Sequence, residues 1–126
     1  DRLIGECDFL SLHLHLNDET RHTIDARRLA LMRPSACVIN VARGALADEE
    51  ALYKALEQGQ LGGAGLDVFA EEPPDHNLPV YQLPNVIVTP HTAGVSDGTA
   101  RKRAACAAEN VERVAAGLEP LYRIDQ

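Results

Sequence analysis

Apolar residues recur with a period of two at the start of the chain and in short β-branched runs further on. Within "DFLSLHLHL" (8–16), leucines alternate with other residues, which predicts a strand that presents its leucines on one face. Three later runs predict further strands, at 36–42, 63–69 and 86–89. The run at 36–42, "ACVINVA", is almost continuously apolar and is typical of a strand buried on both faces.

The segments between these strands carry helical signals. Asp25 can cap a short helix over 23–32, which ends at "RPSA" because Pro34 biases the preceding residue away from helical geometry. Asp48 can cap a second helix, with two glutamates in its first turn and Gly59 or Gly62 to stop it.

The C-terminal part of the chain predicts a proline-rich loop and then a long helix. The loop spans 70–84 and holds four prolines. The helix lies within "SDGTARKRAACAAENVERVAAGLEP", has alanine, valine and leucine at helical spacing, and ends near Gly117 and Pro120. Strands that alternate with helices at short spacing predict an α/β fold with about four parallel strands, flanking helices and a long C-terminal helix.

Composition narrows the function without identifying it. The 126 residues are 45% hydrophobic and 25% charged, which fits one folded domain. A net charge of -7 without a basic stripe argues against nucleic-acid binding. Three separated cysteines without a CxxC pair favour a reducing compartment and argue against a metal site. No apolar run approaches the roughly 20 residues of a membrane span, so we expect a soluble, cytoplasmic protein.

The candidate chemistry lies where three successive strands end. Ligands of open parallel sheets bind outside the carboxyl ends of the strands. Arg43 follows one strand, Asp67 and Glu72 belong to the next strand and its loop, and His91 follows the last. An arginine can hold a substrate carboxylate with two hydrogen bonds, and a histidine paired with a carboxylate can transfer a proton near neutral pH. These groups suit the oxidation of an alcohol next to a carboxylate.

Each of these residues also has a structural interpretation. Arg43 could form a surface ion pair, Glu71 and Glu72 could be solvated loop residues, and His91 could bond to the backbone of a turn. Asp67 is harder to dismiss, because a charge within a strand must be paired. His13 and His15, on one face of the first strand, are best explained by packing or backbone hydrogen bonds.

Four consecutive segments of the chain resemble signature motifs of the D-isomer-specific 2-hydroxyacid dehydrogenases. They are "SLHLHLNDETRHTID", "VINVARGALADEEALYKAL", "GAGLDVFAEEP" and "NVIVTPHTAG", and the resemblance runs from about residue 8 to 123. It implies reversible hydride transfer between a 2-hydroxyacid and NAD or NADP. It also implies that this chain is the second half of a doubly wound, Rossmann-like sheet.

The resemblance assigns expected roles to individual residues. Arg43 matches the arginine that holds the substrate, Glu72 the glutamate that pairs with the catalytic histidine, and His91 that histidine, the general acid and base. Asp67 matches an aspartate near the nicotinamide carboxamide. The other residues expected to line the nicotinamide half of the cofactor site are Leu14, Val41, Ala42, Arg43, His91, Thr92, Ala93 and Gly94.

Two departures from the family pattern limit these expectations. The family usually has proline where this chain has His15, and the chain holds no GxGxxG phosphate loop. We therefore expect residues 1–126 to be a single unit, a partial NAD(P)-binding domain, with 118–126 starting the return to a missing substrate domain. Alone, the chain should have little activity. The leucine-rich edge near 8–16 should favour a homodimer or other self-association.

Other interpretations remain open at the level of the sequence. The chain could be a truncated, non-catalytic assembly or interaction module of the same fold. It could also derive from a formate- or phosphite-type dehydrogenase, because such enzymes use related sheets.

Overall fold

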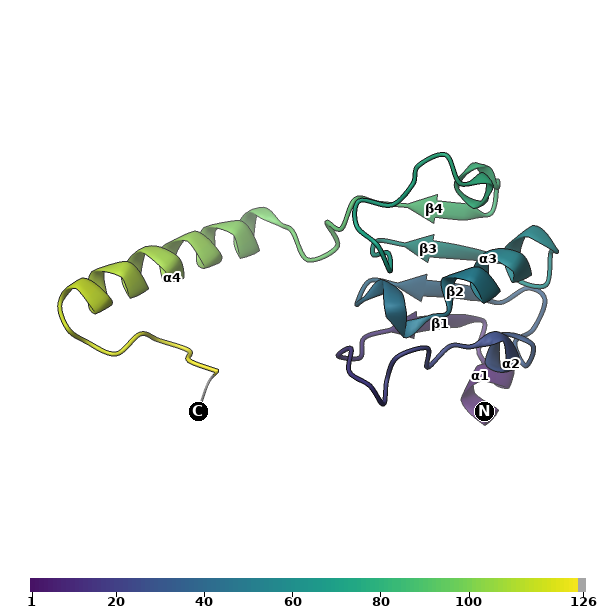
Figure 1. Cartoon of the computed structure of the whole chain (residues 1–126), viewed down its shortest axis with the longest axis horizontal. Coiled ribbons are helices and arrows are strands. Elements are labelled where there is room, and N and C mark those ends of the chain that lie inside the picture. The colour runs from purple at the N-terminus through teal and green to yellow at the C-terminus, as the bar shows by residue number, and fades with distance from the viewer. Residues whose placement is uncertain (125–126) are drawn as a thin grey trace. The chain divides into compact units, whose positions relative to one another are not determined.

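The computed structural model describes residues 1–124 and contains one parallel sheet (Figure 1). Its strands, in the spatial order β1-β2-β3-β4, are β1 (Phe9–Leu12), β2 (Cys37–Asn40), β3 (Gly63–Leu66) and β4 (Val86–Val88). All neighbouring pairs are parallel. The predicted α/β class with a parallel sheet is confirmed, although every strand is shorter than predicted. The residues that follow each strand leave the ladder and form the loops at the carboxyl edge.

The helices predicted after Asp25 and Asp48 begin directly after these caps, but the first is shorter than the predicted 23–32. The helices are α1 (Arg2–Glu6), α2 (Ala26–Leu29), α3 (Glu49–Glu57) and α4 (Asp97–Ala115), with short 3₁₀ helices η1 (Gly44–Leu46) and η2 (Pro79–Gln82). Asp25 accepts a hydrogen bond from the Arg28 amide (2.8 Å), and Asp48 accepts one from the Ala51 amide (3.1 Å). Gly59, at φ 68°, follows the end of α3, so it is this glycine that stops the helix. The sequence patterns did not predict α1.

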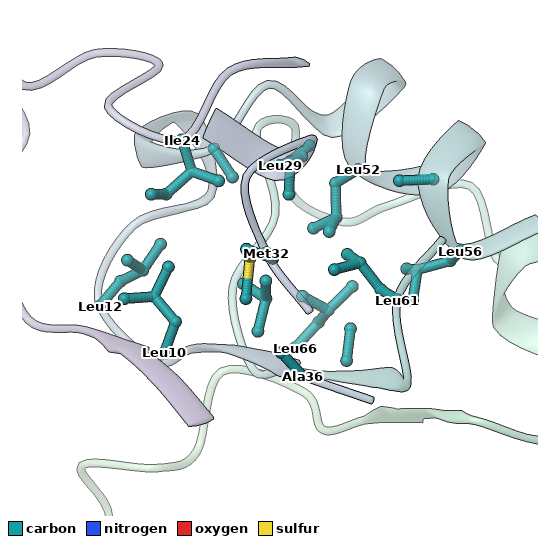
Figure 2. Packing of buried hydrophobic residues seen from close by; sticks show 14 of the residues in the cluster. Leu10, Leu12, Ile24, Leu29, Met32, Ala36, Leu52, Leu56, Leu61 and Leu66 are labelled. Carbon is teal, nitrogen blue, oxygen red and sulfur yellow. The ribbon is translucent and has the colours of Figure 1, made fainter. Parts of the chain in front are cut away.

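The core lies between one face of the sheet and the helices α2 and α3. Leu10 and Leu12 are buried while Phe9 and Ser11 are exposed, so the predicted leucine face is confirmed within β1. Figure 2 shows side chains of the sheet and of the helical segments pointing toward one another. The labelled members of this cluster are Leu10, Leu12, Ile24, Leu29, Met32, Ala36, Leu52, Leu56, Leu61 and Leu66.

Two expectations about the strands are wrong. β2 is not buried on both faces: Val38 and Asn40 are buried, but Cys37 and Ile39 are half-buried, because α2 and α3 cover the opposite face. His13 and His15 do not share a strand face, because the pairing of β1 with β2 ends at Leu12. They lie in the following loop, where His13 Nε2 is 2.7 Å from Ser11 Oγ.

The described chain divides into two compact units, one of residues 1–93 and one that begins at Gly94. The second unit holds α4, whose N-terminus carries a capping box: Ser96 and Thr99 each bind the other's backbone amide. Within α4, the Asn110 side chain binds the segment that follows the helix: it accepts from the Leu121 amide (2.7 Å) and donates to the Leu121 carbonyl oxygen (3.3 Å). The expectation that 1–126 is a single unit remains a prediction. So does the return to a substrate domain over 118–126, of which residues 125–126 lie outside the described part.

No helix of residues 1–124 is long and apolar enough to cross a membrane.

Candidate active site

The loops after β3 and β4 bring a glutamate and a histidine into contact. Glu72 Oε2 lies 2.8 Å from His91 Nδ1, although the two residues are 19 positions apart. Both side chains are partly exposed, 38% for Glu72 and 49% for His91. An ion pair this exposed contributes little to folding stability. The contact therefore matters chiefly because it orients the imidazole.

The state of Glu72 defines the tautomer of the imidazole. The hydrogen bond with His91 lowers the pKa of Glu72, and the Phe69 amide and the positive charge of Arg43 act in the same direction. An ionised carboxylate can only accept hydrogen bonds, so His91 Nδ1 must carry the proton between them. Nε2 is thus left to exchange a proton with a bound molecule.

The backbone of His91 is held in an unusual conformation. Its φ is 54°, in the left-handed region that residues other than glycine seldom adopt. Such strain persists where neighbouring contacts impose it, and it often marks functional sites. Here the amides of the two following residues, Thr92 and Ala93, both donate to the carboxylate of Asp67 (2.8 and 2.9 Å).

Asp67 is the buried anchor of this turn. It follows β3 directly, is only 3% exposed, and also accepts a hydrogen bond from the Thr89 hydroxyl (2.5 Å). Burial raises the pKa of Asp67, but the hydrogen bonds from Thr89, Ala93 and Thr92 outweigh it, and the net effect lowers the pKa. The buried carboxylate is therefore satisfied by hydrogen bonds, although it lies just after the strand and not within it as expected. Its predicted place near a nicotinamide carboxamide remains a prediction.

Arg43 lies at the end of β2, exposed to solvent. Its Nη1 donates to the Ala42 carbonyl oxygen (2.6 Å). The buried Asn40 shapes this turn: its amide donates to the Arg43 carbonyl oxygen (2.9 Å) and its Oδ1 accepts from the Ala42 amide (3.2 Å). Sequence reasoning overlooked Asn40, although a polar residue inside an apolar strand was an available signal.

Gly44 lets the Arg43 turn and the Glu72 turn pack backbone against backbone. A Cβ at Gly44 would overlap the backbone of Phe69 and Ala70. No larger residue fits without moving one of the two turns. The "RG" pair therefore joins the arginine to the loop that carries Glu72.

A hollow after β1 and β2 gathers several residues predicted to line the cofactor. It is lined by Leu14, Val41, Ala42 and Arg43, together with His13, His15 and Leu16. At His15, where the family usually has proline, the Thr20 hydroxyl donates to the carbonyl oxygen (2.6 Å) and closes the loop. Of the remaining predicted cofactor residues, Thr92 and Ala93 bind Asp67, and Gly94 opens the second unit.

Comparison with known proteins shows the family of this chain. Residues 1–93 match the family described as "D-isomer specific 2-hydroxyacid dehydrogenase, NAD binding domain". The chain belongs to this family. Glyoxylate/hydroxypyruvate reductase B of Pectobacterium carotovorum is 47% identical over 111 residues, which are 88% of this chain and 35% of that protein.

Solved structures agree with the family assignment. The NAD-complexed form of a D-isomer specific 2-hydroxyacid dehydrogenase from Lactobacillus delbrueckii ssp. bulgaricus is similar with a TM-score of 0.87 at 32% identity, over 98% of this chain and 42% of that one. A family member from Xanthobacter autotrophicus Py2, in complex with NADPH and MES, has a TM-score of 0.76 at 38% identity, over 97% of this chain and 50% of that one. The chain thus spans about a third to a half of the length of these three proteins.

The family assignment makes NAD or NADP the cofactor class of this domain. The hollow after β1 and β2 fits a nicotinamide half, because it lies outside the carboxyl ends of parallel strands, where such folds bind nucleotides. The predicted resemblance and fold are confirmed. The roles of individual residues stay predictions.

Proposed function

We propose that this chain carries the proton-transfer and substrate-binding residues of an NAD(P)-dependent dehydrogenase that interconverts D-2-hydroxyacids and 2-oxoacids. The observation that carries the proposal is the 2.8 Å contact of His91 Nδ1 with Glu72, which leaves Nε2 available. Bound cofactor would supply the hydride that the reaction exchanges with the substrate carbon.

His91 and Glu72 would move the proton of this reaction. In reduction, Nε2 of the protonated imidazole donates a proton to the substrate carbonyl oxygen, and in oxidation it takes the proton back from the hydroxyl. The Glu72 carboxylate stabilises the imidazolium and keeps the proton on Nδ1. Arg43 would release the Ala42 carbonyl and hold the substrate carboxylate with its planar guanidinium.

We further propose that Leu14, Val41, Ala42, Arg43, Asp67, His91, Thr92, Ala93 and Gly94 line the nicotinamide half of the cofactor. The hollow that contains the first four supports this assignment. A small 2-oxoacid is the proposed substrate class, since one relative is a glyoxylate/hydroxypyruvate reductase. The chain's three free cysteines fit a reducing cytoplasm, which we propose as its location.

A segment exchange tests the proposal. The matching segment of the Pectobacterium reductase is replaced by this chain, and reduction of glyoxylate and hydroxypyruvate is followed with NADH and NADPH. We expect the exchanged protein to turn over while the isolated chain shows little activity, because the chain holds no GxGxxG pyrophosphate loop. A folded exchanged protein without activity, checked by circular dichroism, would count against the proposal.

The second expected property is self-association through β1. This strand lies at an edge of the sheet, and its Phe9 is 69% exposed. Exposed edge strands favour pairing with another chain. Light scattering should show a dimer or larger species that Phe9→Lys weakens. Ile87→Lys, on the opposite edge strand β4 and with 72% exposure at Ile87, serves as the matched control. A monomer at all concentrations would refute this part.

A further inference from the structure

A second carboxylate holds the turn that carries Glu72. Glu49, the first residue of α3, accepts a hydrogen bond from the Ala70 amide at 2.6 Å. The preceding amide, that of Phe69, donates to Glu72 Oε1 at 3.1 Å. Two successive amides of one turn are therefore bound by two different carboxylates, one from α3 and one from the turn itself.

Glu49 is held in place by the packing of α3. α3 is anchored in the core by Leu52, Ala55 and Leu56, which are all buried. One helical turn after Glu49, the Tyr53 side chain acts to lower the pKa of Glu49, so the two side chains are neighbours. The Tyr53 hydroxyl also lies 3.1 Å from the Tyr81 hydroxyl.

Tyr81 also contacts the turn that Glu49 binds. The Tyr81 ring packs edge-on against the ring of Phe69, with ring centroids 5.6 Å apart. The Phe69–Ala70 segment thus meets Glu49 through an amide and Tyr81 through a ring. Both contacts connect this segment to α3, because Glu49 belongs to α3 and Tyr81 contacts Tyr53 of the same helix.

Stabilisation of the helix dipole does not account for Glu49. Its neighbour Glu50 occupies the same first turn and is exposed. An acid at either position favours the helix N-terminus. Glu49 is different, because burial raises its pKa and the negative charge of Glu72 adds to the rise, while the hydrogen bond from the Ala70 amide and the nearby Tyr53 side chain act in the other direction. A charged carboxylate at this place is repelled by the nearby Glu72. Its contact with the Ala70 amide therefore needs an explanation other than helix stabilisation.

We propose that Glu49 is a positioning residue for the Glu72–His91 pair: by binding the Ala70 amide it fixes the turn from which Glu72 reaches His91. This inference rests on the proposed function, since the pair is what Glu49 positions. Two accounts of Glu49 predict opposite effects on Glu72. If Glu49 acts only as a nearby negative charge, its removal lowers the pKa of Glu72. If Glu49 positions the turn, its removal loosens the bonds from His91 and Phe69 and raises that pKa.

The experiment titrates the Glu72 carboxyl by carbon NMR in the 126-residue chain. We expect Glu49→Ala to raise the pKa of Glu72 toward its ordinary value, and to speed hydrogen exchange of the Phe69 and Ala70 amides by about tenfold or more. Glu49→Gln keeps an acceptor oxygen without the charge, so it should restore slow exchange and should not raise the pKa. Glu50→Ala, the matched control, should change neither quantity.

Glu49→Asp keeps the test decisive if Glu49→Ala does not fold. This variant keeps the charge on a shorter side chain that no longer reaches Ala70, so positioning predicts a raised pKa of Glu72. A lowered or unchanged pKa in Glu49→Ala, or an unchanged one in Glu49→Asp, would overturn the inference. None of these readouts requires turnover, so failure of the proposed reaction would be seen separately, in the exchanged reductase.

Discussion

Replacing Gly44 by alanine should displace the turn that carries Glu72. The added Cβ would overlap the backbone of Phe69 and Ala70, well inside the 3.0 Å that Cβ atoms essentially never breach. Ordinary contact begins at 3.4 Å, so the Phe69–Ala70 backbone must retreat by about 1 Å or more. That segment has little room, because Val68 and Phe69 are buried.

The magnitude follows from what this retreat breaks. Overpacking of this kind costs about 1–3 kcal/mol. A displaced turn also weakens the bonds from the Ala70 amide to Glu49 and from the Phe69 amide to Glu72, which adds about 1–2 kcal/mol. We therefore expect Gly44→Ala to lower the free energy of unfolding by about 2–5 kcal/mol, a large part of the ~5–15 kcal/mol that holds a domain together.

Urea unfolding followed by circular dichroism measures this loss. Gly65→Ala is the matched control, since a Cβ at Gly65 would meet only the Ile39 side chain at 3.9 and 4.0 Å, an ordinary contact. The free energy of unfolding of this control should stay within about 1 kcal/mol of that of the unchanged chain. If Gly44→Ala were as mild as Gly65→Ala, the close backbone approach would not exist as described.

Two further predictions concern the turn of His91. Asp67→Asn leaves the Ala93 amide facing a side-chain N–H₂ group. We therefore expect this variant to lower the free energy of unfolding by about 1–3 kcal/mol at neutral pH. Because the folded-state pKa of Asp67 is lowered, its contribution is present above the unfolded pKa and is lost as the pH falls through the folded value, below about pH 4. The difference in unfolding free energy between Asp67→Asn and the unchanged chain, measured by urea unfolding, should therefore shrink in acid. A difference that does not depend on pH would contradict this. At φ 54°, His91→Gly should be about 1 kcal/mol more stable to urea than His91→Ala, and equal stabilities would show that the turn is unstrained.

Much of the fold follows from the sequence because its signals are local. The alternating leucines give the buried face of β1, and the aspartates at 25 and 48 cap their helices as expected. Strand lengths do not follow, because a strand ends where its partner leaves the ladder, as β1 does at Leu12. The covered face of β2 likewise depends on where α2 and α3 pack, which periodicity within 36–42 does not report.

The candidate site divides in the same way. Parallel strands deliver their ends to one edge, so the meeting of Glu72 and His91 could be expected from their places in the chain. The residues that hold these two side chains in place could not be expected from the sequence. Glu49 lies 21 residues from Ala70, and the demand for glycine at position 44 arises from a loop 25 residues away. Such contacts come from tertiary packing and leave no periodic signal.

The most direct test of the account is the turnover of His91→Ala in the exchanged reductase. His22→Ala is the matched control, because His22 is also exposed and also has a positive φ, of 51°, but lies outside the pair. We expect His91→Ala to lower kcat by about 10²–10⁴-fold, Glu72→Gln to move the pH optimum, and His22→Ala to change neither. Unchanged kinetics in folded His91→Ala would contradict the central claim that this imidazole transfers the proton.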